Sequence, residues 1–395
     1  MTKLSSSTST VSLLSFATMF VIGTDTFVVA PLLPTLSDKF YISTDISGWL
    51  ISAYALGYAL FALVAGPWSD GRDRRRVLLS GLVGFIVMTA LCGFAQGFWM
   101  MILFRFFAGA SAAFVSPQIW ASIPVLVKPE QIVRTMGSAT AGLAIAQVVG
   151  IPLGAWLGAI SWHMTFWAIS GASIVLWLVL FKVFPPVPSR LSSSQNRIFS
   201  TYGTLLRNRT LRLYLLAYLV FQTGNFEALS FFGSWFHKDF GLGLRSIGLA
   251  MMVLGTGFAI GSLFGSHLVH RLGQYRSLFM AIVTLIVFYC ILPFSPNLAM
   301  ALIVLALVMM VAGFVFPVFM STLLAQTETA RGTVSSLANA AMYTGTTIGG
   351  VVGGILLHRI SGFFGVASFT ILAYLASLGI YTWAGAFRKS LHEVS

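Results

Sequence analysis

The chain has 395 residues, of which 57% are hydrophobic and only 8% are charged. Soluble globular domains contain about 25% charged residues, so this composition excludes a soluble globular protein. The formal net charge of +13 would also suit a nucleic-acid-binding protein, but the placement of the basic residues, given below, argues against a nucleic-acid partner.

Long apolar segments fill most of the chain. A helix needs roughly 20 apolar residues to cross a bilayer. Twelve segments meet this condition, at residues 11–36, 46–68, 77–98, 99–127, 133–161, 163–185, 210–236, 245–270, 276–295, 298–326, 332–358 and 362–387. The first is longer than the core of a secretory signal, so we expect it to be retained. The chain is predicted to be an all-α membrane protein with twelve transmembrane helices and no sizeable soluble domain.

The basic residues fall mainly on one side of these twelve spans. If the N-terminus is cytoplasmic, 18 of the 23 Lys and Arg residues lie on the inner side and 4 on the outer side, with Arg105 inside a span. Cytoplasmic loops of membrane proteins carry an excess of Lys and Arg. The split predicts a multi-pass protein of the plasma (inner) membrane with both termini in the cytoplasm, and it accounts for the positive net charge.

The longest hydrophilic break, residues 186–209, divides the spans into six and six. It begins at Pro186, directly after Pro185, and contains a run of serines, a composition typical of a linker. We therefore expect a six-helix bundle over residues 1–185, a cytoplasmic linker over 186–209, and a second six-helix bundle over 210–395.

Features of the first half return about 200 residues later. An acid stands inside the first span, Asp25, and another inside the seventh, Glu227. The pattern Gly150-x-x-x-Gly154 returns as Gly350-x-x-x-Gly354, and the basic turn that ends at Arg76 returns in weaker form at Arg276. An internal repeat of this length indicates a carrier built from two similar bundles.

Asp25 is the first candidate for proton coupling. A carboxylate at the bilayer centre costs on the order of 2.5–3.5 kcal/mol on insertion scales, and such acids often mark ion or proton pathways. Asp25 can be neutral, or ionised only when water or a cation reaches it, which suits a proton carrier. The alternative is a protonated acid that only hydrogen-bonds a neighbouring helix.

Glu227 and Arg105 complete the charged candidates inside the spans. Gln222 and Asn225 share a helix face, and Glu227 projects off that face. We expect Glu227 to bind a polar or cationic substrate or to titrate as a second acid, unless it only contacts interfacial water. Arg105 either extends to the outer surface or balances the charge of Asp25 or Glu227.

Other residues are candidates for a gate, a cavity and helix packing. Asp70 interrupts the basic turn after span two and is expected to form, with Gly66, Arg74 and Arg75, a gate that locks in one conformation. Candidate cavity-lining residues are Tyr54, Tyr58, Gln118, Gln147, Gln222, Asn225 and Asn339. Candidates for close helix packing are Gly142, Gly150, Pro152, Gly154, Gly350 and Gly354, because small residues four apart let helix backbones approach.

Several of these motifs, in this order, resemble those of the major facilitator superfamily. Gly66-x-x-x-Asp70 with Arg74 and Arg75 is similar to the loop after span two, although Gly71 and Asp73 depart from that pattern. Arg105-Phe-Phe-Ala-Gly109 resembles the span-four motif, and Gly150-Ile-Pro152-Leu-Gly154 resembles the span-five motif of exporters, although the family usually has its Gly and Pro adjacent. In the turn at 161–166, His163 stands where the family usually has an arginine.

The resemblance implies the major facilitator fold and, within it, the twelve-span drug–proton antiporter branch. It implies a gating role for Asp70 and a role in proton coupling for Arg105. We therefore expect a proton-coupled exporter of small amphipathic compounds, working by alternating access around a site between the bundles. The alternative is an exporter of one specific metabolite, such as a sugar, nucleoside or amino acid derivative.

Other function classes find little support in the sequence. Cys92 and Cys290 each lie inside a span and read as small apolar residues, and no metal-ligand spacing occurs. No His-Glu-x-x-His or Gly-x-Ser-x-Gly motif indicates an enzyme. We expect no cofactor and no metal; the expected partners are protons, a small-molecule substrate and the lipid bilayer, and the chain is expected to act as a monomer.

Overall fold

The computed structural model describes residues 8–70, 72–187, 203, 205–326 and 331–387, although the side chains of some helical residues, including Gly66 and Asp70, lie outside the described part. The described residues form helices and no strands. Those of the first half are α1 Thr8–Phe27, α2 Val29–Phe40, α3 Thr44–Ser47, α4 Trp49–Asp70, α5 Arg74–Cys92, α6 Phe98–Leu126, α7 Pro129–Ile145, η1 Ala146–Gly150, α8 Ile151–Ile160 and α9 Trp162–Val183. Those of the second half are α11 Arg209–Phe240, α12 Leu244–Leu272, α13 Gln274–Ile291, η2 Leu292–Phe294, α14 Leu298–Leu324, α15 Arg331–Arg359 and α16 Phe364–Trp383.

Eleven helical segments among the described residues are long and apolar enough to cross a membrane. They correspond to eleven of the twelve predicted spans, with ends that differ by a few residues. The remaining predicted span, 210–236, is the 32-residue helix α11, which is long enough but less apolar. Its lower hydropathy follows from the polar residues Gln222, Asn225 and Glu227 in its middle.

Two spans are interrupted near a proline. The first span changes direction at Val28, between α1 and α2, where the following Pro31 has no amide hydrogen to donate to the carbonyl four residues earlier. In the fifth span, a five-residue π-helical turn, η1, separates α7 from α8 just before Pro152. A proline removes one helical hydrogen bond and crowds the preceding turn, so an extra residue in that turn relieves the clash.

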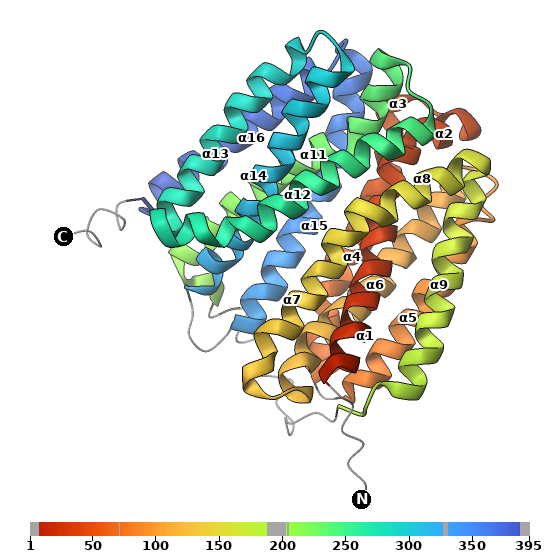
Figure 1. Ribbon diagram of the computed structural model, residues 1–395, viewed down its shortest axis with the longest axis vertical. Coiled ribbons are helices and arrows are strands. Elements are labelled where there is room, and N and C mark those ends of the chain that lie inside the picture. Colours follow the sequence, from red (N-terminus) through yellow and green to blue (C-terminus); the bar gives the residue numbers. More distant parts are fainter. Residues whose placement is uncertain (1–7, 71, 188–202, 204, 327–330, 388–395) are drawn as a thin grey trace, which may run out of the picture.

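The helices form two bundles with the same internal pairing (Figure 1). In the first bundle, α1 packs on α7, α4 on α6, and α5 on α9. In the second, α11 packs on α15, α12 on α14, and α13 on α16. These pairs join corresponding spans of the two halves, as an internal repeat requires. The protein therefore has the two-bundle, twelve-span architecture expected from the repeat.

The two bundles meet mainly at one end, which we call the closed end. It carries the loops at residues 41–43, 161, 241–243 and 360–363. There α3 and α4 contact α15, α2 contacts α11, and α8 contacts α12. A methyl group added at Gly48 would overlap the carbonyl oxygen of Gly350, so the backbones of α4 and α15 touch at this point. Toward the opposite end, α7 and α12 diverge (Figure 1).

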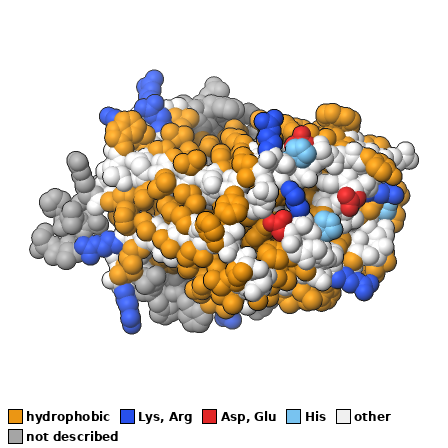
Figure 2. Space-filling model, turned by 90° about the horizontal axis from the view of Figure 1, so that it is seen from above, with side chains coloured by type: hydrophobic (Ala, Val, Ile, Leu, Met, Phe, Trp, Pro, Cys, Tyr) orange, Lys and Arg blue, Asp and Glu red, His pale blue; other side chains and the backbone are white. Residues whose placement is uncertain are grey.

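The surface is divided into apolar flanks and charged ends. Large apolar side chains are exposed along the bundle flanks, among them Val87 on α5, Val175 on α9 and Leu372 on α16. A soluble monomer rarely exposes such extensive apolar surface, whereas lipid tails cover it without penalty. Figure 2 shows this apolar band, with acidic, histidine and basic side chains mixed toward the right of the view and only basic ones coloured at the left.

Candidate functional site

A buried ion pair lies in the core of the first bundle. The guanidinium Nη1 of Arg105, on α6, donates a hydrogen bond to Oδ2 of Asp25, on α1, at 2.9 Å, and neither side chain is exposed. Arg105 also lies near the carbonyl oxygens of Asp25 and Leu50, each at 3.4 Å. Its guanidinium carbon is 4.3 Å from the ring centroid of Tyr54. Arg105 therefore does not extend to the outer surface, and it neutralises Asp25.

One oxygen of this pair has no partner. Oδ1 of Asp25 is buried and makes no hydrogen bond with any described residue. A carboxylate has about four lone-pair sites, and a buried site left empty is costly in a low-dielectric interior. Asp25 can therefore accept a proton or a water at Oδ1 while Oδ2 still faces Arg105.

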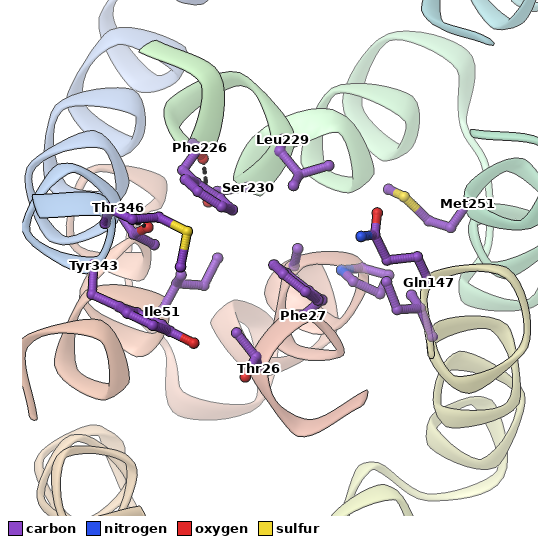
Figure 3. Close-up of a pocket in the computed structure, with 14 residues that line it drawn as sticks. Thr26, Phe27, Ile51, Gln147, Phe226, Leu229, Ser230, Met251, Tyr343 and Thr346 are labelled. Atoms are coloured by element: carbon purple, nitrogen blue, oxygen red, sulfur yellow. Dashed lines mark hydrogen bonds between the residues drawn. The ribbon is translucent and has the colours of Figure 1, made fainter. Parts of the chain in front are cut away.

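A pocket lies between the two bundles, close to the ion pair. Its empty space is about 590 Å³, counting the part that is open to solvent. The lining comes from α1, α2, α4, η1 and α8 of the first bundle and from α11, α12 and α15 of the second. The lining residues are Thr26, Phe27, Ala30, Pro31, Ile51, Gln147, Ile151, Phe226, Leu229, Ser230, Met251, Met342, Tyr343 and Thr346. Figure 3 shows the labelled side chains of both bundles converging on this space.

Two residues connect the pocket to the ion pair. Thr26 lines the pocket and lies next to Asp25 in the chain, and its hydroxyl oxygen is 3.2 Å from the phenolic oxygen of Tyr54. The ring of Tyr54 in turn covers the guanidinium of Arg105. A ligand that moves Thr26 or Tyr54 therefore changes the surroundings of the Asp25–Arg105 pair.

The second intramembrane acid, Glu227, lies inside the other bundle. Its side chain is fully buried on α11, and Oε2 accepts a hydrogen bond from the Thr370 hydroxyl of α16 at 2.9 Å. Oε1 is buried without a hydrogen-bond partner among the described residues. No salt bridge of Glu227 occurs among those residues. An ionised Glu227 would thus carry the cost of desolvation with no balancing cation. Glu227 does not contact interfacial water and does not line the pocket.

The predicted cavity residues occupy different positions. Of the seven, Gln147 lines the pocket directly. Tyr58 stacks on the lining residue Tyr343 across the bundle boundary, with centroids 3.8 Å apart, and Tyr54 lies behind Thr26. The other four lie away from the lining. Gln118 is buried on α6, Gln222 donates to the Tyr218 hydroxyl, Asn225 lies 3.4 Å from the Tyr374 hydroxyl, and Asn339 is half-buried on α15.

The predicted gate falls partly outside the described residues. The side chains of Gly66 and Asp70 lie outside them, so the lock expected of Asp70 stays a prediction. Arg75 is described, and its guanidinium bonds the carbonyl oxygen of Phe181. Backbone groups also tie this turn to the end of the sixth span, because the amide of Arg74 donates to the Val187 carbonyl at 3.1 Å.

Asp73, which departs from the family pattern, has a clear structural role in this turn. It is the N-cap of α5, and its Oδ1 accepts from the amide of Arg75 at 3.0 Å. The same oxygen accepts from the amide of Val187 at 3.0 Å. One side chain therefore both caps a helix and holds the beginning of the 186–209 segment.

The packing glycines divide into two groups with different partners. Gly142, Gly150 and Gly154 press against residues of α1 and against Val28, inside the first bundle. Gly350 and Gly354 instead meet the carbonyl oxygens and hydroxyls of α3 and α4, across the boundary between bundles. The residues of α15 that pack inside their own bundle are Gly345, Gly349 and Gly353, which lie against α11. Pro152 is buried at the start of α8.

Several pocket residues escaped the sequence analysis. Phe27 and Met251 line the pocket, and Thr370 bonds Glu227. In a chain with 34 phenylalanines and 15 methionines, no single one stands out. A signal was present for one of them, since Phe27 lies two residues from the intramembrane acid Asp25.

Comparison with known proteins agrees with the transporter architecture described above. A family model described as Major Facilitator Superfamily matches residues 15–350. The uncharacterized MFS-type transporter YceJ of Bacillus subtilis (strain 168) is 47% identical over 368 residues, covering 93% of this chain and 94% of that protein. YwfA of the same organism, also an uncharacterized MFS-type transporter, is 26% identical over 384 residues, covering 95% and 93%.

The fold is also that of solved transporters. The crystal structure of a D-xylose–proton symporter superimposes with a TM-score of 0.78 at 13% identity, covering 93% of this chain and 96% of that one. At this identity the likeness concerns the fold alone. The family match over most of the chain, the relative at 47% identity and the paired bundles agree, and the chain belongs to the major facilitator superfamily.

Proposed function

We propose that this transporter is a proton-coupled exporter of small amphipathic compounds, with the Asp25–Arg105 pair as its proton switch. One observation carries the proposal: a fully buried acid–base pair lies one residue from the wall of a pocket that both bundles line. Carriers of this architecture bind substrate near the midplane between their two halves.

The coupling follows from charge balance. With Asp25 ionised, the pair is neutral and Arg105 is held in place. A proton on Oδ1 leaves the positive charge of Arg105 uncompensated in a buried site, which favours a conformation that exposes or re-pairs the guanidinium. Tyr54 and Thr26 carry this change to the pocket wall, so proton binding and substrate binding compete through the same side chains.

The direction of transport is proposed from the charge distribution. The basic loops at residues 72–76, 128–134 and 207–212 lie at the end opposite the closed end, and the positive-inside rule places them in the cytoplasm. The pocket is then shut off from the outside, and both termini are cytoplasmic. A carrier that is closed on its outer side accepts substrate from the cytoplasm, and the inward proton gradient drives the substrate out.

Glu227 is proposed to act separately from the switch. It lies inside the second bundle and its partner, Thr370, comes from the same bundle. Its backbone lies against Gly349, and its side chain lies against Gly353, on α15. Loss or gain of a proton at Glu227 would therefore alter the packing of α11 on α15, the helix that touches the first bundle.

The test is substrate-induced proton release from purified protein, combined with transport into proteoliposomes. Asp25→Asn should fold and bind substrate, release no proton, and fail to transport against a gradient, while Glu227→Gln should retain proton release on substrate binding. Full gradient-driven transport by Asp25→Asn would refute the assigned switch.

A second candidate, export of one specific metabolite, is supported by the buried amide of Gln147 in an otherwise apolar lining. A growth panel separates the two candidates. Protection against many unrelated toxic compounds supports broad export, whereas protection against a single chemical series supports a specific exporter.

A further inference from the structure

Gln147 differs from the two threonines and the serine that line the pocket. The hydroxyls of Thr26, Ser230 and Thr346 each donate to a carbonyl oxygen of their own helix, at 2.6–3.0 Å, so their hydrogens are already used. The side-chain amide of Gln147 makes no hydrogen bond with any described residue, and only 8% of the residue's surface is exposed. Figure 3 shows the amide pointing into the pocket near Phe27.

The local backbone explains why this amide is presented to the pocket. Gln147 lies in the π-helical turn η1, between α7 and α8. Such a turn rotates the following residues relative to a regular helix, and it often occurs at functional sites. The amide nitrogen and oxygen of Gln147 are accessible from the pocket, so a ligand that carries both a donor and an acceptor can pair with them.

The pocket also offers two parallel aromatic faces, one from each bundle. The rings of Phe27 and Phe226 have centroids 6.2 Å apart and planes inclined by only 6°. A flat ligand ring can stack in parallel on either of these rings.

The lining contains no charged side chain. Of the two acids that neighbour lining residues in the chain, Asp25 is neutralised by Arg105, and Glu227 is directed toward Thr370 inside the second bundle. A permanently charged ligand that moves from water into this pocket would find no counter-ion there. Its desolvation would therefore carry a large free-energy cost. The pocket therefore disfavours organic cations as well as anions.

From the free amide, the parallel rings and the uncharged lining together, we propose that the substrate is an uncharged, flat aromatic compound with a donor–acceptor edge, such as a lactam or a carboxamide on a ring. Its N–H donates to Oε1 of Gln147, its carbonyl accepts from Nε2, and its ring stacks against Phe27 or Phe226. This inference rests on the proposed function only in taking the pocket as the transport site.

The test uses three compounds of one size. Quinolin-2(1H)-one is flat and neutral with a lactam edge, N-methylquinolinium has the same rings with a fixed charge, and naphthalene has neither edge nor charge. Binding to purified full-length protein in nanodiscs is measured by equilibrium dialysis without a proton gradient. We expect the quinolinone to bind at least tenfold more tightly than the other two, since a net hydrogen bond contributes roughly fivefold to tenfold in affinity.

Two variants of Gln147 are expected to change ratios of affinities in different ways, which a general loss of folded protein would not do. Gln147→Leu should remove the preference for quinolinone over naphthalene, and Gln147→Glu should raise the affinity for N-methylquinolinium relative to quinolinone. Gln326→Leu, at the end of α14 and outside the lining, serves as the matched control and should change neither ratio.

The outcomes separate this inference from the proposed proton coupling. Equal or tighter binding of N-methylquinolinium to the natural protein, or a quinolinone preference that survives Gln147→Leu, would overturn the substrate class. Because dialysis needs no proton gradient, Asp25→Asn should keep the preference for quinolinone even though it loses coupled transport. Loss of coupling without loss of this preference supports both proposals.

Discussion

Replacement of Asp25 by asparagine should destabilise the protein as well as uncouple it. Arginine stays charged in proteins, so Asp25→Asn leaves the fully buried guanidinium of Arg105 without a counter-ion. Breaking a buried ion pair by removing one partner costs about 3–5 kcal/mol, whereas an exposed pair contributes about 0–1 kcal/mol. The hydrogen bond from Arg105 to the asparagine oxygen recovers part of the loss, so we expect a decrease of about 2–4 kcal/mol in the free energy of unfolding.

The assay is unfolding by sodium dodecyl sulfate in dodecylmaltoside micelles, followed by circular dichroism. A double-mutant cycle with Arg105→Met separates the pair from its surroundings. The double variant should be more stable than Asp25→Asn alone, because it no longer contains an uncompensated buried charge. Asp38→Asn, an exposed acid at the end of the same span, is the control and should stay within about 0.5 kcal/mol of the natural protein.

Two results would refute this reasoning. One is a loss below about 1 kcal/mol for Asp25→Asn, which is the behaviour of a solvated ion pair. The other is a double variant no more stable than the single one, which would mean that Arg105 finds another partner once the acid is neutralised.

Three further predictions concern the contacts around the site. Gly350→Leu should hold the closed end open, because the added side chain overlaps Ser52 and Gly48. Spin labels attached at Tyr41→Cys and Leu242→Cys, in a Cys92→Ala, Cys290→Ala background, should then report a longer distance between the two labels. An unchanged distance between them would contradict the contact. Thr370→Val should lower the free energy of unfolding by about 1–3 kcal/mol, since it removes the hydroxyl that bonds buried Glu227; Thr382→Val, on the exposed face of the same helix, should have little effect. Asp73→Ala should lower the free energy of unfolding by about 0.5–2 kcal/mol through loss of the α5 cap. It should also speed trypsin cleavage within residues 188–202, because Val187 loses its hydrogen-bond acceptor. Equal cleavage rates would show that this hydrogen bond does not limit cleavage.

The sequence alone determined the class of protein, the spans and the repeat. These follow from one-dimensional properties: the length of apolar segments fixes where a chain can cross a bilayer, and proline and glycine positions fix where helices bend or approach. The span at 210–236, which is α11, was found in this way although Gln222, Asn225 and Glu227 make it less apolar than the other spans. The same reasoning indicated Asp25 and Arg105 as functional candidates from their burial in apolar segments.

Which side chains face one another could be learned only from the packed arrangement of the helices. Asp25 and Arg105 are 80 residues apart, and the sequence allowed Arg105 to pair with either acid or with none. Gly350 and Gly354 match Gly150 and Gly154 in sequence, yet they pack across the bundle boundary, because the rotation of α15 about its own axis depends on its packing against α4 and α11. Gln147 was one of seven polar candidates until the π-helical turn directed its amide into the pocket. A periodic pattern defines the faces of a helix, but the neighbour that each face meets depends on the arrangement of all the helices.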